Sequence, residues 1–128
     1  NAHFLPKMVN RASGRIIHIG SDASLTGQSA PAYAAAKAAM NAYVKSTARY
    51  YVKHHIMMCA VLPGIFEHED SVWAEKKKTN PEHYQQAIKS RPLGRFNTPD
   101  EIATAVADIA CSSTLTYAGS LIELTAGF

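Results

Sequence analysis

The sequence of 128 residues predicts an α/β fold built on a parallel sheet. Short apolar runs alternate along the chain with longer segments of helical periodicity, which is typical of strands joined by crossover helices. The runs read RIIHIGS at 15–21, IMMCAVLPG at 56–64 and SLIELTA at 120–126. The first two are apolar at most positions, which favours strands buried on both faces of a sheet.

The helices of the first half follow from their boundary residues. Residues 1–13 are predicted to be the tail of a helix that ends before the first strand. Small polar residues fill 22–31 and predict a loop. A long helix is then expected over 32–54, with Ser29 as its N-cap and Pro31 in its first turn.

The second half contains a polar segment and one well-marked helix. Residues 65–90 predict two helical pieces, broken at Asn80-Pro81. Thr98 and Glu101 have the spacing of a capping box, so we expect a helix to begin there and to run to about residue 111.

Three strands are few for a sheet covered on both faces. The run at 15–21 is too apolar for an exposed edge, so we expect a neighbouring strand outside these residues. The chain also opens without methionine, within a predicted helix, and stops directly after the third strand. We therefore expect the sequence to be a piece of a larger fold.

Composition excludes several classes of function. A formal net charge of +3 without a basic stripe argues against nucleic-acid binding. No apolar run approaches the roughly 20 residues of a membrane span. Cys59 and Cys111 lie far apart in apolar surroundings, so both are expected to be buried free thiols in a reducing, cytoplasmic setting.

Tyr33 and Lys37 carry the first chemical signal. Residues four apart share one face of a helix, so the phenol and the ammonium are expected to lie one turn apart. A unit positive charge about 4 Å from the phenol is worth about 4 kcal/mol at an effective dielectric of about 20, which favours the ionised phenol. Such a pair suits a general acid/base near neutral pH. The alternative is that both side chains belong to an ordinary solvated helix face.

The neighbouring strand ends favour the chemical interpretation. Ser21 closes the run at 15–21, and Pro63-Gly64 closes the next one. Ligands of open α/β sheets bind at the carboxyl ends of the strands. Ser21, Tyr33, Lys37 and Pro63-Gly64 are therefore expected at one edge of the sheet.

Four motifs in this order resemble the short-chain dehydrogenase/reductase family, in particular its group that includes 3-oxoacyl-carrier-protein reductases. They read GRIIHIGS, YAAAK, VLPG and RPLGRFNTPDEIATAVADIA. The resemblance covers essentially the whole chain. It implies a Rossmann-like, doubly wound parallel sheet, of which residues 1–128 form the carboxyl-terminal, catalytic part.

The resemblance also implies an activity, namely NAD- or NADP-dependent hydride transfer between the nicotinamide and a small carbonyl or secondary alcohol. Ser21 matches the serine that binds the substrate carbonyl, and Tyr33 matches the acid/base. Lys37 matches the lysine that holds the nicotinamide ribose. Residues 63–65 (Pro63, Gly64 and Ile65) match the segment that contacts the carboxamide, and 66–90 match the substrate lid.

The chain also departs from the family pattern. It contains no glycine-rich TGxxxGxG turn, so NAD cannot be told from NADP and residues 1–128 by themselves are expected to be inactive. The loop before Tyr33 is one residue short, which leaves Ser24 as a rival to Ser21. The family's catalytic asparagine is not assigned to Asn1. The alternative function is a truncated or non-catalytic relative that serves as a scaffold or dinucleotide sensor.

The remaining expectations concern partners and the lid. The family resemblance and the alanine-rich helix imply a homodimer or homotetramer. EHED at 67–70 is expected to be a mobile lid tip rather than a metal site, and KKK at 76–78 a solvated helix face. Trp73 and Tyr84 either line the substrate mouth or pack the lid.

Overall fold

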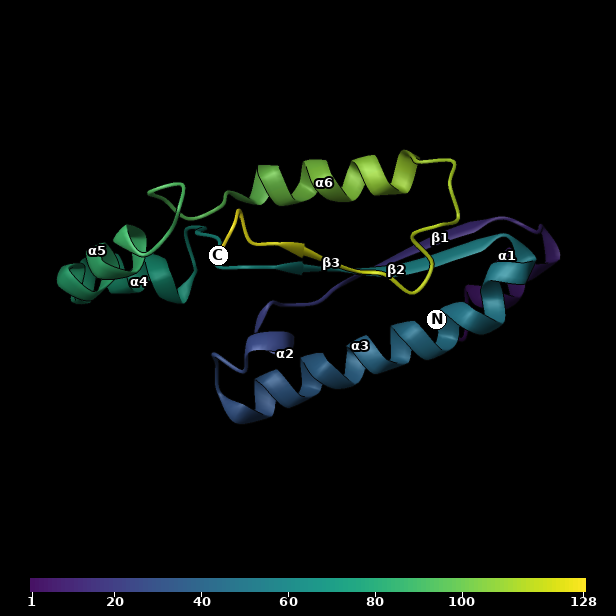
Figure 1. The fold of residues 1–128 in the computed structure, drawn as a ribbon, viewed down its shortest axis with the longest axis horizontal. Helices are drawn as coiled ribbons and strands as arrows, with labels where there is room; N and C mark the ends of the chain where they lie inside the picture. The colour runs from purple at the N-terminus through teal and green to yellow at the C-terminus, as the bar shows by residue number, and fades with distance from the viewer.

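The central strand β2, Ile56–Pro63, organises the fold, which a computed structural model describes for all residues 1–128 (Figure 1). It pairs in parallel with β1 (Gly14–Ile19) on one side and with β3 (Leu121–Leu124) on the other. Every residue of β2 is buried. The predicted parallel α/β sheet is confirmed.

The two faces of β2 belong to two separate apolar cores, because side chains alternate across a strand. Helix α3 (Pro31–Tyr51) covers one face of the sheet and helix α6 (Pro99–Cys111) covers the other (Figure 1). The core on the α3 side contains Leu5, Val44, Ala48, Ile56, Met58, Ala60 and Leu62. The core on the α6 side contains Met57, Cys59, Val61 and Ile109.

Helix α3 begins one residue earlier than expected and is capped differently. The N-cap is Ala30, which makes no side-chain cap hydrogen bond, so the assignment of Ser29 as N-cap is wrong. The reason lies in Pro31, which restricts the residue before it to extended backbone and thereby makes that residue the cap. A 3-10 turn, Val52–His54, follows the helix and completes the expected span.

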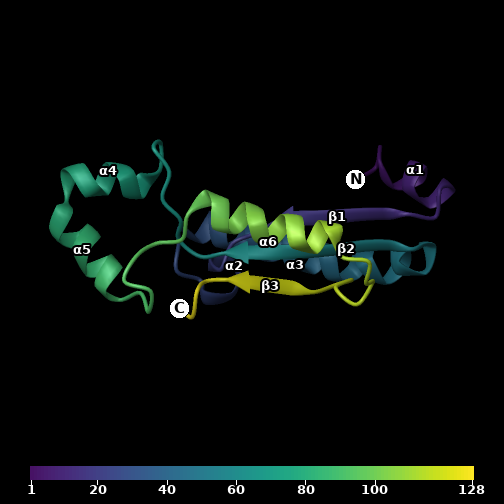
Figure 2. The same cartoon turned by 90° about the horizontal axis from the view of Figure 1, so that it is seen from above.

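Four shorter helices lie at the two ends of the sheet. Helix α1 (Leu5–Asn10) precedes β1, and α2 (Ala23–Thr26) is a short helix inside the expected loop. Helices α4 (Val72–Thr79) and α5 (Pro81–Lys89) lie beyond the carboxyl ends of the strands, away from the sheet (Figure 2). The predicted break holds, since Asn80 is both the C-cap of α4 and the N-cap of α5.

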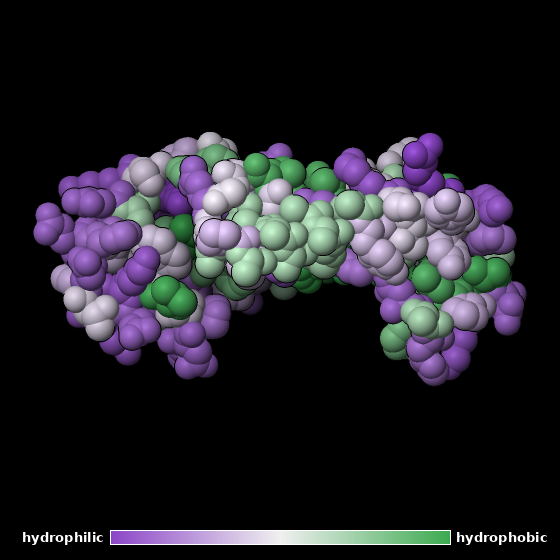
Figure 3. Space-filling view, turned by 90° about the horizontal axis from the view of Figure 1, so that it is seen from below, coloured by the Kyte–Doolittle hydropathy of each residue, from purple (hydrophilic) through white to green (hydrophobic).

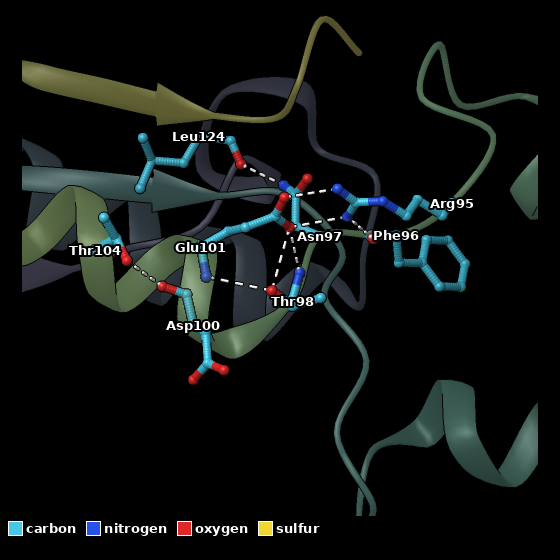
Figure 4. A network of polar contacts seen from close by, with 8 residues as sticks. All are labelled: Arg95, Phe96, Asn97, Thr98, Asp100, Glu101, Thr104 and Leu124. Carbon is cyan, nitrogen blue, oxygen red and sulfur yellow. Dashed lines mark hydrogen bonds and ion pairs between the residues drawn. The ribbon is translucent and has the colours of Figure 1, made fainter.

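The start of α6 is fixed by a polar network (Figure 4). Thr98 and Glu101 form the predicted capping box, and Arg95 makes two hydrogen bonds to the Glu101 carboxylate at 2.7 and 2.9 Å. The side-chain amide of Asn97 donates to the Leu124 carbonyl at 2.9 Å and ties this segment to the end of β3. Together these bonds place the start of α6 at the carboxyl edge of the sheet.

The two cysteines, both expected to be buried, differ in their exposure. Cys59 is buried as expected, and burial raises the pKa of its thiol. Cys111 is exposed, so that prediction is wrong. Ile109 takes the sheet-facing position in the last turn of α6, and two residues further along a helix the side chain points away. No helix combines the length and the apolarity that crossing a membrane requires.

We predict that acid opens the first turn of α6. The hydrogen bonds from Arg95 and from the Thr98 backbone lower the pKa of Glu101 to about 2. Because this folded-state pKa lies below the value of an unfolded glutamate, the stabilisation is present above about pH 4.5 and is lost as pH falls toward about 2. The protection factors of the amides of residues 100–102 should therefore fall over this range.

The variant Glu101→Gln is the control for this prediction. Its amide can still serve the capping box but cannot titrate. In this variant the protection factors of the amides in the first turn should change less between pH 5 and pH 2 (a window about the two values above,). Equal acid responses of both proteins would contradict the assignment.

Candidate active site

The parallel pairing of β1 with β2 continues beyond the last residue of β1. The Gly20 amide donates to the Val61 carbonyl at 2.7 Å, and the Asp22 amide donates to the Pro63 carbonyl at 3.0 Å. Ser21 lies between these two bonds, so its position is set by the end of β2. The expected convergence of both strand ends on one edge is therefore present in the backbone.

One glycine allows the chain segments to approach one another at this edge. A Cβ atom on Gly20 would lie 2.3 Å from a methyl carbon of Leu62, so no other residue fits there without displacement. A Cβ on Gly64 would lie 3.4 Å from the Thr125 Cα and 3.6 Å from the Asp22 carboxylate, which are ordinary contact distances. The close packing of the two strand ends therefore depends on Gly20.

A cavity of about 380 Å³ opens at this edge, between the sheet and α4. Four of the predicted site residues line it, namely Ser21, Tyr33, Gly64 and Ile65, and neither Pro63 nor Lys37 does. The complete lining is Ser21, Asp22, Ala23, Gln28, Ser29, Tyr33, Gly64, Ile65, Phe66, Trp73 and Lys76. Clefts of this size suit small molecules.

Tyr33 and Lys37 lie on one face of α3, as their spacing predicts. The Lys37 ammonium is 5.7 Å from the centre of the Tyr33 ring and donates to the Ile19 carbonyl at 3.0 Å. Tyr33 is 46% exposed, and its ring borders the cavity. The ammonium therefore anchors to the end of β1 while its charge remains near the phenol.

The hydrogen bonds favour Ser21 over Ser24 as the serine that meets a ligand. Ser24 does not line the cavity, and its hydroxyl is occupied, since it donates to the Ser21 carbonyl at 2.6 Å and accepts from Asn41 at 2.7 Å. The Ser21 hydroxyl accepts from the Ala23 amide at 3.2 Å and donates to Asp22 at 3.3 Å. The second bond is long, so Ser21 can exchange it for a ligand carbonyl at low cost.

One backbone group in the cavity wall is free to bind a ligand. The Ile65 amide makes no hydrogen bond within the chain, whereas the Gly64 amide donates to Leu124 at 3.1 Å. The Ile65 carbonyl, which belongs to the next peptide, accepts from the backbone amide of Asn97 at 3.3 Å. The unpaired Ile65 amide is a hydrogen-bond donor that a ligand could use.

Trp73 and Tyr84, which were expected either to line the substrate mouth or to pack residues 66–90, differ in their surroundings. Trp73 lines the cavity and also packs on Phe96, with ring centres 4.9 Å apart. Tyr84 is buried, packs edge-on against Phe96 and donates a short hydrogen bond to Glu67. Lys77 pairs with the same carboxylate at 3.2 Å, so Glu67 and Lys77 join the lid tip to α4.

The run KKK does not behave as one solvated face. Lys76 is half-buried, lines the cavity and holds its ammonium 4.5 Å from the centre of the Trp73 ring. Lys78 is exposed, as expected for the whole run. The expectation is wrong for Lys76 because α4 turns this one lysine toward the sheet.

Sequence reasoning missed Asn41 as well as Lys76. Asn41 is buried and belongs to the stripe that Val44 and Ala48 continue at helical spacing. A polar residue on an otherwise apolar stripe was the available signal. No three or more His, Cys, Asp or Glu side chains are grouped in positions that could hold a metal ion.

The chain is similar to known oxidoreductases along most of its length. Residues 2–128 match the family model described as enoyl-(acyl carrier protein) reductase. The chain is 33% identical over 125 residues to 2,3-dihydroxy-2,3-dihydro-p-cumate dehydrogenase of Pseudomonas putida, which covers 97% of this chain. It is 32% identical over 121 residues to the 3-oxoacyl-[acyl-carrier-protein] reductase of Vibrio cholerae, which covers 94%. The chain belongs to the short-chain dehydrogenase/reductase family.

Solved structures of short-chain dehydrogenases/reductases have the same fold. A 3-oxoacyl (acyl-carrier-protein) reductase from Agrobacterium tumefaciens with NADP bound superposes with a TM-score of 0.87 at 31% identity, over 97% of this chain. An NAD⁺-bound xylitol dehydrogenase gives a TM-score of 0.81 at 25% identity, over 94%.

The chain covers only part of the length of each of these relatives. The chain spans about half the length of the short-chain dehydrogenases/reductases it resembles, 48% of both curated relatives named above and 48% and 51% of the two solved structures. The fold class expected from the sequence, the carboxyl-terminal part of a Rossmann-like sheet, is therefore confirmed.

We predict that Asn41→Ala loosens the loop that holds Ser21. The substitution removes the bond from Asn41 to Ser24 and leaves the Ser24 hydroxyl without that donor. A net loss of about 1 kcal/mol in unfolding free energy is expected, measured by urea denaturation. The amide resonances of Ser21 and Ala23 should shift.

Ser46→Ala is the matched control, because Ser46 is an exposed polar residue on the same helix. It should leave both the stability and these resonances unchanged. If Asn41→Ala behaved like Ser46→Ala, Asn41 would have no positioning role.

Proposed function

We propose that this chain is the catalytic part of an NAD- or NADP-dependent oxidoreductase that acts on a small carbonyl or secondary alcohol. The observation that carries the proposal is the shared cavity at the carboxyl edge of the sheet, which Ser21, Tyr33 and Ile65 line together. Lys37 stands one turn beyond Tyr33. The cofactors bound in the similar structures support the same choice.

Each residue has a role in this proposal. The nicotinamide, when bound, supplies or accepts the hydride. The Ser21 hydroxyl releases its long bond to Asp22 and donates to the substrate oxygen. Tyr33 gives a proton to that oxygen in reduction and removes it in oxidation. The Lys37 ammonium, which donates to the Ile19 carbonyl, has further donors available for the ribose hydroxyls.

The helices α4 and α5 form the proposed lid, which covers most of residues 66–90. Trp73 supports this role, because it borders the cavity on the side opposite the sheet. Packing of Trp73 and Tyr84 on Phe96 gives the lid a small core of its own. Such a lid can move as a unit and exclude water from the reacting groups.

We predict that Tyr33→Phe abolishes turnover in the enzyme that carries this segment together with a dinucleotide-binding half. The ring is kept and the proton donor is lost, so the rate should fall by about 100-fold or more while cofactor affinity stays nearly unchanged. Lys37→Met should weaken both turnover and cofactor affinity, because it removes the ammonium proposed to hold the ribose. Steady-state kinetics across pH and fluorescence titration with reduced cofactor measure the two effects.

Tyr43→Phe is the matched control, since Tyr43 is another partly exposed tyrosine of α3 but bonds to Asn1 outside the cavity. It should keep the wild-type rate. A Tyr33→Phe enzyme with a tenth or more of wild-type activity would exclude the tyrosine as the acid. Cofactor binding without turnover in the wild type would favour the alternative, a dinucleotide sensor or scaffold.

We also propose that the outer face of α3 is the contact between subunits of a homodimer or homotetramer. Its exposed stripe contains Ala35, Ala39 and Ala42, small residues that allow another helix to approach closely. Figure 3 shows a pale green patch in the middle of the face viewed from below, the side that α3 covers. Tyr43 and Tyr50, exposed by 43% and 69%, border an adjoining groove of about 440 Å³.

We predict that Ala39→Glu disrupts this contact, because it places a charge in the middle of the alanine stripe. The mass from light scattering should fall from that of a dimer or tetramer to that of one chain. Lys53→Glu, an exposed change beyond the end of the helix, should not alter the mass. A wild-type monomer at tens of micromolar (an order-of-magnitude range for specific association,) would refute the proposed interface.

A further inference from the structure

The cavity that holds Ser21 and Tyr33 contains two charged side chains. They are Asp22, beside the serine, and Lys76, on α4. Tyr33 is the only other titratable group in the lining. The charge that a bound molecule meets at the lid side therefore depends on whether Lys76 is neutralised by a carboxylate of the chain.

No carboxylate neutralises Lys76. The two ion pairs of the structure are Lys77 with Glu67 and Arg95 with Glu101, and the side chain of Lys76 makes no hydrogen bond. The neighbouring acid on α4, Glu75, is exposed and does not line the cavity. The half-buried ammonium is instead held over the Trp73 ring, at 4.5 Å from its centre. A cation–π contact orients an ammonium without cancelling its charge.

Asp22, the other charge in the cavity, lies next to Ser21 at the sheet edge and not on the lid. Its carboxylate accepts a hydrogen bond from the Ser21 hydroxyl at 3.3 Å. It is also attracted to the Arg91 guanidinium, which lies outside the cavity lining. The lid side of the cavity consequently presents one positive charge on an aromatic surface, without an acidic partner.

We propose that the substrate of this site carries an anionic group, a carboxylate or a phosphate, which Lys76 binds beside the Trp73 ring. This inference rests on the proposed function, since it names the substrate class of the same site. An ammonium that lines the cavity without an acidic partner can make a charge-assisted contact with an anion that reaches it there. Lys76 is thus a specificity-determining residue, and Ser21 and Tyr33 remain the residues that meet the reacting oxygen.

The single tryptophan of the chain makes the inference testable without turnover. Fluorescence of Trp73 can be titrated with benzoate, phenyl phosphate and benzyl alcohol, three probes with the same ring and different heads. We expect at least one anion to bind about tenfold or more tighter than the alcohol, a typical value for one charge-assisted contact. The tighter of the two anions identifies carboxylate or phosphate as the preferred group.

Two variants assign the preference to one side chain. Lys76→Met keeps a long apolar stem over the ring and should reduce the affinity for the preferred anion to that for benzyl alcohol. Lys78→Met, an exposed change on the same helix, should keep the wild-type preference. Equal affinities of the wild type for all three probes, or an unchanged preference in Lys76→Met, would overturn the inference.

The outcome is separable from that of the proposed oxidoreductase activity. Turnover of neutral alcohols with no preference for anions in the titration would overturn the inference and leave the activity standing. If anions bind tightly through Lys76 but the protein has no oxidoreductase activity, the proposed activity is overturned and the inferred anion site stands.

Discussion

Two backbone hydrogen bonds beyond the end of β1 fix the position of Ser21, on which the candidate site depends. Because the Gly20 and Asp22 amides donate to carbonyls of β2, the chain stays beside the sheet until Ser21 has reached the last residues of the central strand. β2 itself is buried on both faces and has little freedom to shift. The position of Ser21 is thus inherited from the most rigid element of the fold.

The other site residues depend on the same edge through different links. Asn41 connects α3 to the loop through Ser24, and Lys37 connects α3 to the Ile19 carbonyl at the end of β1. These two bonds fix the helix that carries Tyr33 against the strand that precedes Ser21. Asn97, by contrast, holds the Ile65 peptide and the end of β3 together. The proposed site residues Ser21, Tyr33 and Ile65 therefore lie on three segments, after β1, on α3 and after β2, which hydrogen bonds hold at one edge of the sheet.

The sequence predicted the parts of this framework that depend on local patterns. The buried runs, the break at Asn80-Pro81 and the capping box at Thr98 were all readable, because each rests on neighbours in sequence. The cap of α3 was misassigned because the effect of Pro31 on the preceding residue was overlooked. Lys76 could not be told from its neighbours, since which lysine faces the cavity depends on how α4 docks. Long-range docking of this kind leaves no periodic signal in a single sequence.

A crystal structure of the enzyme that carries this segment, with oxidised cofactor bound, tests whether the proposed site holds the nicotinamide. We expect the Ile65 amide to donate to the nicotinamide carboxamide and the Lys37 ammonium to contact the ribose hydroxyls, with the nicotinamide ring facing the cavity that Ser21 and Tyr33 line. A cofactor bound away from this edge, with the Ile65 amide still unpaired and Lys37 still held only by Ile19, would contradict this expectation.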